Sequence, residues 1–357
     1  MNDRGMHSKK PDDKHLAEII DALHKRCPWA TLRKALSDAD FGVRGGWEGL
    51  KEKTKNDLSD PEKLANFLSN FYRDYLIVGE RAVQLYCFEG AEVKTIISEV
   101  KKLIPADSVF SEKYPLPLTS GGLGSANDSP TFVEIRVNSD DEVMLVFCSK
   151  RSYQERDKYS PTQLNEAVRK AFGSFDELIA IRHTVYQAFD VVVFNPKKER
   201  IELRIDQPKL LIADEIARVM ARLIVEVQAL VPGAAHLLQP TTAQNLFPAI
   251  SEMYLSSKEG KVIDLGFQTH TGSIKHEKMR HSDADLRSEV FHAAGKAAIK
   301  TITPFSITLS WDDVRLTLPG HFRNLSEPAP YLGYARISSC TTASKFSALI
   351  NKLVSYL

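Results

Sequence analysis

The stretch that most constrains the fold is Phe189–Asp206, FDVVVFNPKKERIELRID, in which two largely apolar runs flank a short polar segment. β-Branched and aromatic residues on both sides of an Asn-Pro segment are typical of two strands joined by a turn. Other strand runs farther along the chain also occur in pairs. Segregated hairpins of this kind favour antiparallel sheets with helices packed on one face, rather than a doubly wound parallel sheet.

The register of this hairpin decides which of its side chains meet. A five-residue loop, NPKKE, pairs Phe194 with Arg200. One face is then apolar and the other carries Asp190, Glu202 and Arg204, because cross-strand partners share a face. A four-residue loop would bury Asp190 as a lone carboxylate among aliphatic side chains, at a cost of several kcal/mol. We therefore expect the five-residue loop.

An acid opposite an acid-x-base triplet is also how many metal-dependent nucleases are built. In that interpretation Asp190 and Glu202 hold Mg²⁺, and Arg204 stabilises the attacking water or the phosphorane. An arginine cannot lose its proton at neutral pH, however, so it replaces the usual lysine poorly. A cross-strand ion pair between Asp190 and Arg204 on a solvated sheet face, contributing about 0.2–1 kcal/mol, explains the pattern by folding alone. We expect the ion pair and keep the nuclease as an alternative.

The order of elements divides the chain into five parts. Residues 1–13 are polar and are expected to form a disordered tail. Apolar residues at helical spacing, with one short strand among them, predict a mostly helical domain over 14–105. A segment rich in Pro, Gly and Ser predicts a linker or long loop over 106–130. Two α+β units are expected to follow, over 131–232 and 233–357.

Both of these units read as hairpin, helix, hairpin, helix. In the second unit we expect strands near 251–256, 261–268 and 274–280, and then a helix that begins at Ser282. The repeated order suggests a duplicated body, although no repeat is evident at the level of residues. The predicted fold class is α+β, with a helical N-terminal domain followed by this body with antiparallel sheets.

Composition excludes several classes of protein. The 47 basic and 46 acidic side chains nearly cancel, so any attraction to nucleic acid must come from a local patch. No signal-peptide core and no run of about 18 apolar residues is present, which predicts a cytoplasmic protein without membrane contact. The four cysteines form no C-x-x-C pair, which predicts reduced thiols. We expect no cofactor, apart from Mg²⁺ in the nuclease alternative.

One local patch is the stretch SKRSYQERDKYS, which directly follows an apolar strand and is expected to be a loop. Basic side chains that meet the backbone, and a tyrosine such as Tyr153 that stacks on bases, are what single-strand or RNA binding requires. Glu155 and Asp157 dilute the charge. The basic candidates are Lys150, Arg151, Arg156 and Lys158.

Two further stretches carry basic groups. QTHTGSIKHEKMRH reads as the tip of a strand-turn-strand unit that could contact phosphates, and its histidines lack the spacing of a zinc site. GVRGGWEGLKEKTK could supply a recognition helix, although acidic residues share that helix. The candidates in the first stretch are Lys275, His276, Lys278 and Arg280, and those in the second are Arg44 and Lys51.

These patterns favour a non-enzymatic subunit of a cytosolic complex that binds nucleic acid or serves assembly, together with a protein partner or further copies of itself. A genome-defence or chromosome-associated complex of a prokaryote would suit this profile. No serine-elbow or kinase motif supports nucleophilic or phosphoryl-transfer catalysis. The alternatives are the metal-dependent nuclease and a protein-interaction adaptor that binds no nucleic acid.

Overall fold

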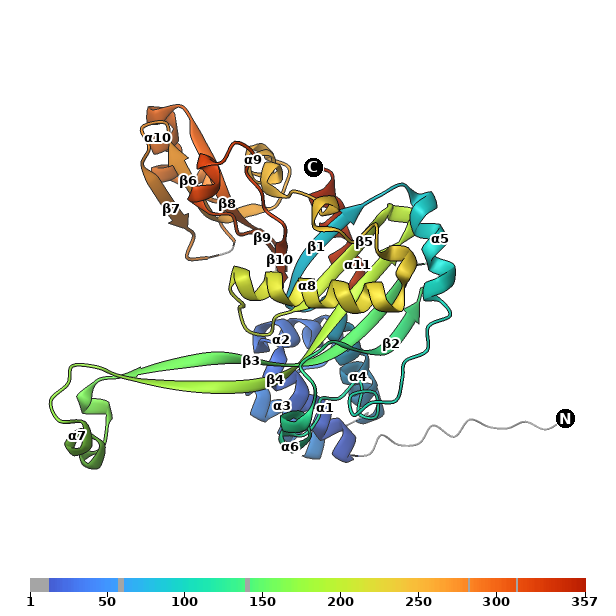
Figure 1. The fold of residues 1–357 in the computed structure, drawn as a ribbon. Helices are drawn as coiled ribbons and strands as arrows, with labels where there is room; N and C mark the ends of the chain where they lie inside the picture. Colours follow the sequence, from blue (N-terminus) through green and yellow to red (C-terminus); the bar gives the residue numbers. More distant parts are fainter. Residues whose placement is uncertain (1–12, 57–60, 139–141, 282, 313) are drawn as a thin grey trace.

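The computed structural model describes residues 13–56, 61–138, 142–281, 283–312 and 314–357, so that the predicted tail lies outside the described residues except for Asp13. Within these ranges ten strands form one sheet, and all neighbouring strands are antiparallel (Figure 1). In their order across the sheet the strands are β2 (Thr131–Val137), β3 (Val143–Tyr159), β4 (Leu178–Asn195), β5 (Arg200–Asp206), β1 (Arg81–Cys87), β10 (Ala335–Ser338), β9 (Val314–Leu318), β8 (Ile302–Trp311), β6 (Lys261–Thr269) and β7 (Ile274–Lys278).

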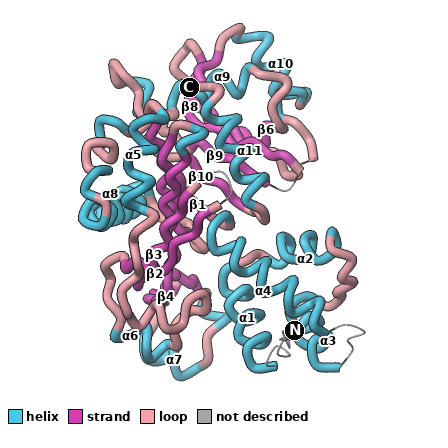
Figure 2. The backbone as a smooth tube through the Cα atoms, turned by 90° about the vertical axis from the view of Figure 1, so that its right-hand side faces the viewer, coloured by secondary structure: helices cyan, strands magenta, loops and turns pink. Residues whose placement is uncertain are grey.

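Eleven α-helices occur in the described ranges, and most of them flank this sheet (Figure 2). The four that precede β1 form the predicted helical N-terminal region. The helices are α1 (Asp13–Arg26), α2 (Trp29–Asp38), α3 (Gly46–Asn56), α4 (Pro61–Val78), α5 (Gly90–Val100), α6 (Ser120–Ser125), α7 (Glu166–Phe172), α8 (Ala213–Leu230), α9 (Phe247–Leu255), α10 (Val290–Ile299) and α11 (Ala343–Val354).

Helices cover both faces of the sheet in the half that contains β3, β4 and β5. On one face α5 and α8 pack against side chains that include Val192 and Leu203. On the other face α1 and α4 pack against Phe189, and α11 packs beside Val191. The expectation of helices on one face is therefore wrong here. Burial on both sides explains why every residue of β5 is buried, the charged ones included.

Strands β3 and β4 extend well beyond their neighbours in the sheet. Strand β2 pairs with β3 only as far as Cys148, and β5 pairs with β4 only over Val191–Asn195. Residues 152–159 and 178–185 continue as a two-stranded ribbon that projects from the body and carries α7 near its end (Figure 1). We call this ribbon the arm. At about 3.3 Å per residue it is about 26 Å long.

The α+β class and the helical N-terminal region are confirmed. Strand β1, which the sequence assigned to the helical domain, nevertheless lies between β5 and β10 in the middle of the sheet. In the predicted linker, Phe110 and Leu123 are buried in the same core as α1 and α4. One sheet thus joins strands from the N-terminal segment and from both predicted units, while the domain boundaries themselves stay a prediction.

The second unit differs from its prediction in two places. The expected strand near 251–256 is helix α9, because Ala249, Ile250, Met253 and Tyr254 are buried at helical spacing after a proline in the first turn. The helix expected from Ser282, which lies outside the described residues, is α10 and begins at Val290. The strand order also departs from a simple repeat, because β6 rather than β7 pairs with β8.

Candidate functional site

The arm has two faces that differ sharply in exposure. Eight side chains, four from each strand, point to one face, and all eight are exposed; we call it the open face. Its members are Ser152, Gln154, Arg156, Lys158, Ile179, Ile181, His183 and Val185. Of the eight side chains on the opposite, closed face only Arg182 is exposed and the other seven are half-buried. The predicted loop is therefore a strand, and alternation sorts its side chains.

The two faces also differ in charge. Arg156 and Lys158 lie on the open face, which carries no carboxylate. Glu155 and Asp157 lie on the closed face, where Arg182 Nη2 is 2.5 Å from Asp157 Oδ2. The two acids that dilute the basic stretch in sequence thus point away from its basic side chains in space.

Two features qualify this picture of the arm. Lys158 Nζ lies 3.2 Å from Glu177 Oε2, just beyond the ribbon, so part of its charge is compensated. Tyr153 lies on the closed face, where its ring centroid is 5.7 Å from that of Tyr186 and the Lys209 ammonium is 5.9 Å from it. Tyr153 therefore belongs to the packing of the arm and is not presented with Arg156.

The other two basic candidates of this stretch lie where the arm leaves the body. Lys150 Nζ is 3.2 Å from Asp128 Oδ1. Arg151 is largely buried, donates through Nη1 to the Asp206 carbonyl at 3.1 Å, and forms an ion pair through Nη2 with Asp190. Arg151 therefore has a structural partner that the sequence did not predict.

The hairpin of β4 and β5 does not have the predicted register. Asn195 pairs with Arg200, so the loop has four residues, and Glu199 in it adopts a left-handed conformation with φ of 51°. The objection to this register was the isolation of Asp190. The objection fails because Arg151 and the backbone N–H of Asp206, at 2.9 Å, both bind the Asp190 carboxylate.

This register separates the three residues of the nuclease alternative. Asp190 faces α8, whereas Glu202 and Arg204 point to the opposite face of the sheet. There Glu202 accepts hydrogen bonds from Arg200 Nε and Arg204 Nη2, both at 2.6 Å, and the Arg204 guanidinium lies 4.2 Å from the centre of the Phe346 ring. The predicted ion pair between Asp190 and Arg204 is therefore wrong. Both carboxylates are fully buried, so the geometry on which the nuclease prediction rested is absent.

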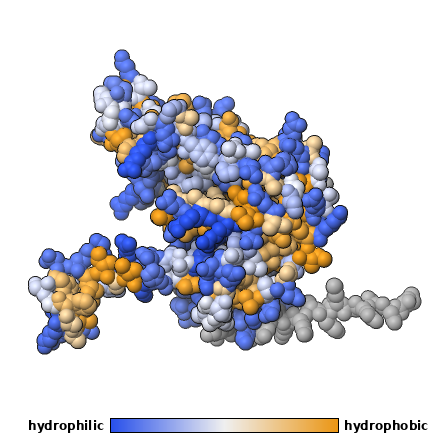
Figure 3. Space-filling model, viewed as in Figure 1, coloured by the Kyte–Doolittle hydropathy of each residue, from blue (hydrophilic) through white to orange (hydrophobic). Residues whose placement is uncertain are grey.

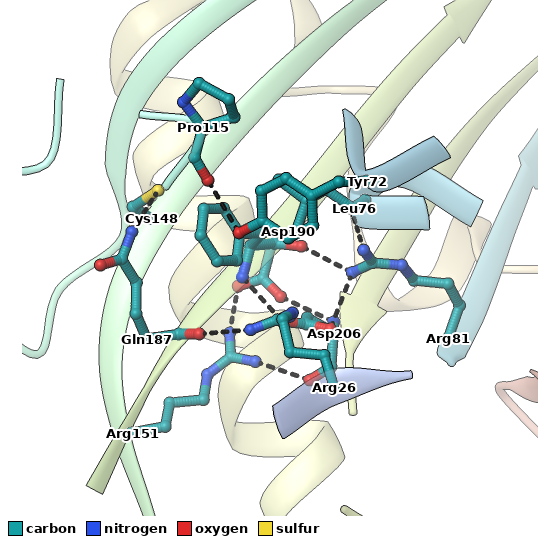
Figure 4. Close-up of polar contacts among 11 residues, drawn as sticks. Arg26, Tyr72, Leu76, Arg81, Pro115, Cys148, Arg151, Gln187, Asp190 and Asp206 are labelled. Atoms are coloured by element: carbon teal, nitrogen blue, oxygen red, sulfur yellow. Dashed lines mark hydrogen bonds and ion pairs between the residues drawn. The ribbon is translucent and has the colours of Figure 1, made fainter. Parts of the chain in front are cut away.

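A second buried ion cluster joins the N-terminal region to the sheet (Figure 4). Asp206 at the end of β5 forms ion pairs with Arg26 of α1 and, at 3.4 Å, with Arg81 of β1, and it accepts a hydrogen bond from the Phe189 N–H at 2.9 Å. Arg81 also donates to the backbone carbonyls of Phe189, at 2.6 Å, and Leu76. The cluster fixes α1, α4 and β1 against β4 and β5.

The pKa values of these carboxyls follow from burial and from the neighbouring arginines. Burial raises the pKa of Asp190, although Arg151 opposes the shift. Burial alone would also raise the pKa of Asp206, but Arg26 and Arg81 outweigh it and the pKa lies below its usual value. Glu202 behaves like Asp206, because its two arginines outweigh burial and lower its pKa. The chemistry of these groups is thus that of permanent ion pairs.

The remaining basic candidates are exposed but scattered. On edge strand β7, Lys278 lies 3.6 Å from Asp264 and the His276 ring centroid lies 5.2 Å from that of Phe305. Lys275 and Arg280 are exposed beside them. Strand β7 and the arm extend from the same side of the molecule (Figure 1).

The candidates near α3 are placed differently from one another. Arg44 is exposed, whereas Lys51 is compensated by Asp21 at 3.2 Å and Glu48 at 3.9 Å. In the part of the chain that the structure describes, no group of three or more His, Cys, Asp or Glu residues could hold a metal ion, and no helix there is both long and apolar enough to cross a membrane.

Sequence reasoning missed two sets of residues. Arg218 and Arg222 are exposed on α8 and, with Lys150 and Arg151, line a hollow at the root of the arm. Their spacing of four residues was the available signal. Arg26 and Asp206 gave no local signal, because they are 180 residues apart in the chain.

Comparison with known proteins gives no relative for this arrangement. No protein-family model matches the chain, and no curated protein matches it significantly.

Proposed function

We propose that the chain is a non-enzymatic nucleic-acid-binding subunit, and that the open face of the arm is the surface that meets nucleic acid. One observation carries this proposal: Arg156 and Lys158 lie together on an exposed face without a carboxylate, although the sequence interleaves them with acids. Cations that are exposed and face the same way can contact phosphates together. Such a subunit would suit a genome-defence or chromosome-associated complex, because both hold nucleic acid.

The shape of the arm supports the same proposal. A two-stranded β-ribbon fits the major groove of B-DNA, which is about 12 Å wide. The strand that carries Arg156 and Lys158 supplies cations for the backbone, and the adjacent strand presents Ile179 and Ile181 on the same face. Aliphatic side chains suit contacts with base edges, such as the thymine methyl group.

The experiment compares two charge-reversed chains. Arg156→Glu with Lys158→Glu changes the open face, whereas Lys101→Glu with Lys102→Glu makes the same change in net charge on exposed residues beside α5, away from the arm (Figure 1). Fluorescence anisotropy with labelled DNA and RNA is measured from 50 to 200 mM salt. We expect weaker binding for the first variant, with a salt slope smaller by about 2 because two phosphate contacts are lost. Equal binding by the two variants would contradict the proposal.

A second candidate function is the adaptor, and a different property of the arm favours it. Ile179, Ile181 and Val185 are about half exposed on the open face, and Phe172 of α7 is 65% exposed near the end of the arm. A projecting ribbon is only marginally stable by itself, and exposed apolar side chains along it suit a protein partner. An adaptor predicts that the wild-type chain shows no salt-dependent binding of DNA or RNA.

A further inference from the structure

The largest concentration of cations in the described structure lines a hollow between α8 and the root of the arm. Its volume is about 360 Å³. Figure 3 shows hydrophilic residues gathered where the arm leaves the body. The charged side chains of its wall are Lys150, Arg151, Arg218 and Arg222 against Asp128 and Glu215. Four cations and two carboxylates leave a net charge of +2, which would attract an anion.

Both carboxylates of the wall are already engaged with protein groups. Asp128 lies 3.2 Å from Lys150 Nζ. Glu215 accepts a hydrogen bond from the Ile212 N–H at 3.1 Å and so caps the start of α8. The arginines of the hollow are therefore compensated incompletely by its own acids.

The three arginines differ in how firmly they are held. Arg151 is fixed by Asp190 and the Asp206 carbonyl, and burial, which lowers its pKa, is outweighed by Asp190, so the guanidinium stays charged. Arg218 donates only to the carbonyl of Asp214, at 3.3 Å, and within the described residues neither Arg218 nor Arg222 forms an ion pair. Like charges four residues apart on a helix repel each other, and a bound anion would relieve that repulsion.

We propose that this hollow is a binding site for a phosphate group, with Arg218 and Arg222 as its main ligands and Arg151 as a fixed charge behind them. Guanidinium groups suit phosphate because they offer paired N–H donors in a planar fork. The hollow reaches Ser152 and Val185, the first cross-strand pair of the open face. The group could thus belong to a small phosphate ester or to a nucleic acid that runs along the arm, and the second source rests on the proposed function.

The first test uses inorganic phosphate at constant ionic strength, with chloride as the reference salt. Arg218→Gln with Arg222→Gln is compared with Lys101→Gln and Lys102→Gln, which also removes two exposed cations but lies beside α5. Isothermal titration should show phosphate binding to the wild type and the control, and binding at least roughly tenfold weaker to the arginine variant. The absence of phosphate binding in the wild type, or equal binding by all three chains, would overturn the proposal.

A second titration with labelled DNA and RNA identifies the source of the phosphate. If the group belongs to nucleic acid, the arginine variant binds it more weakly and inorganic phosphate competes. If wild-type chain binds phosphate but neither nucleic acid, the hollow serves a small phosphate ester. In that case the phosphate site stands while the proposed function of the arm fails, so the two failures are distinguishable.

Discussion

Replacing Asp206 with asparagine removes one negative charge from the buried cluster of Arg26 and Arg81 while keeping the size of the side chain. All three residues are almost fully buried. The new amide would present N–H donors, or at best one neutral acceptor, to two guanidinium groups. Removing one partner of a buried ion pair costs about 3–5 kcal/mol. Because two arginines lose their partner here, we expect a cost of at least about 3 kcal/mol at pH 7.

Urea unfolding of the wild type and of Asp206→Asn measures this cost as a difference in the free energy of unfolding. The control is Asp38→Asn, because Asp38 is exposed and lies 3.7 Å from Lys34 one helical turn away, which predicts a loss below about 0.5 kcal/mol. A natural stability of about 5–15 kcal/mol leaves the Asp206 variant folded.

The pH dependence of the same difference has a fixed sign. The pKa of Asp206 is lowered in the folded chain, so its contribution is complete above the unfolded pKa of about 3.9 and is lost as the pH falls through the lower folded value. The cost of Asp206→Asn should thus be constant from pH 7 to about pH 5 and shrink in stronger acid. Equal costs for the two variants, or a cost unchanged in acid, would refute the reasoning.

Two further predictions concern the nuclease alternative and the apolar strand of the arm. Plasmid DNA incubated with the chain and Mg²⁺ should stay intact on a gel, because Asp190 and Glu202 are buried on opposite faces of the sheet; cleavage that Asp190→Ala abolishes would contradict this. Ile181→Lys adds a cation to the exposed open face and should tighten nucleic-acid binding and steepen the salt slope by about 1, measured by anisotropy. Weaker binding would show that Ile181 serves another partner.

The sequence predicted most strands and helices because their apolar residues recur at the expected periods. It failed at the register of β4 and β5 for an identifiable reason. The prediction treated Asp190 as isolated, yet its partner Arg151 lies 39 residues away on the neighbouring strand. A single hairpin contains no information about a charge that a third strand supplies.

The candidate site was predicted in part. Arg156 and Lys158 were named from composition, but their stretch was interpreted as a loop because charged residues are poor strand formers. Its partner strand, LIAIRHTVYQ, pairs with it residue by residue and imposes the alternation that separates the cations from Glu155 and Asp157. Which face is open depends on the three-dimensional course of the arm, which no local pattern specifies.

The central claim is that the open face binds nucleic acid through Arg156 and Lys158. Its most direct test is the salt dependence of DNA and RNA binding by Arg156→Glu with Lys158→Glu, set against Lys101→Glu with Lys102→Glu. We predict weaker binding and a salt slope reduced by about 2 for the arm variant alone. Identical affinities and slopes for the two variants, or no binding by the wild-type chain, would contradict the claim.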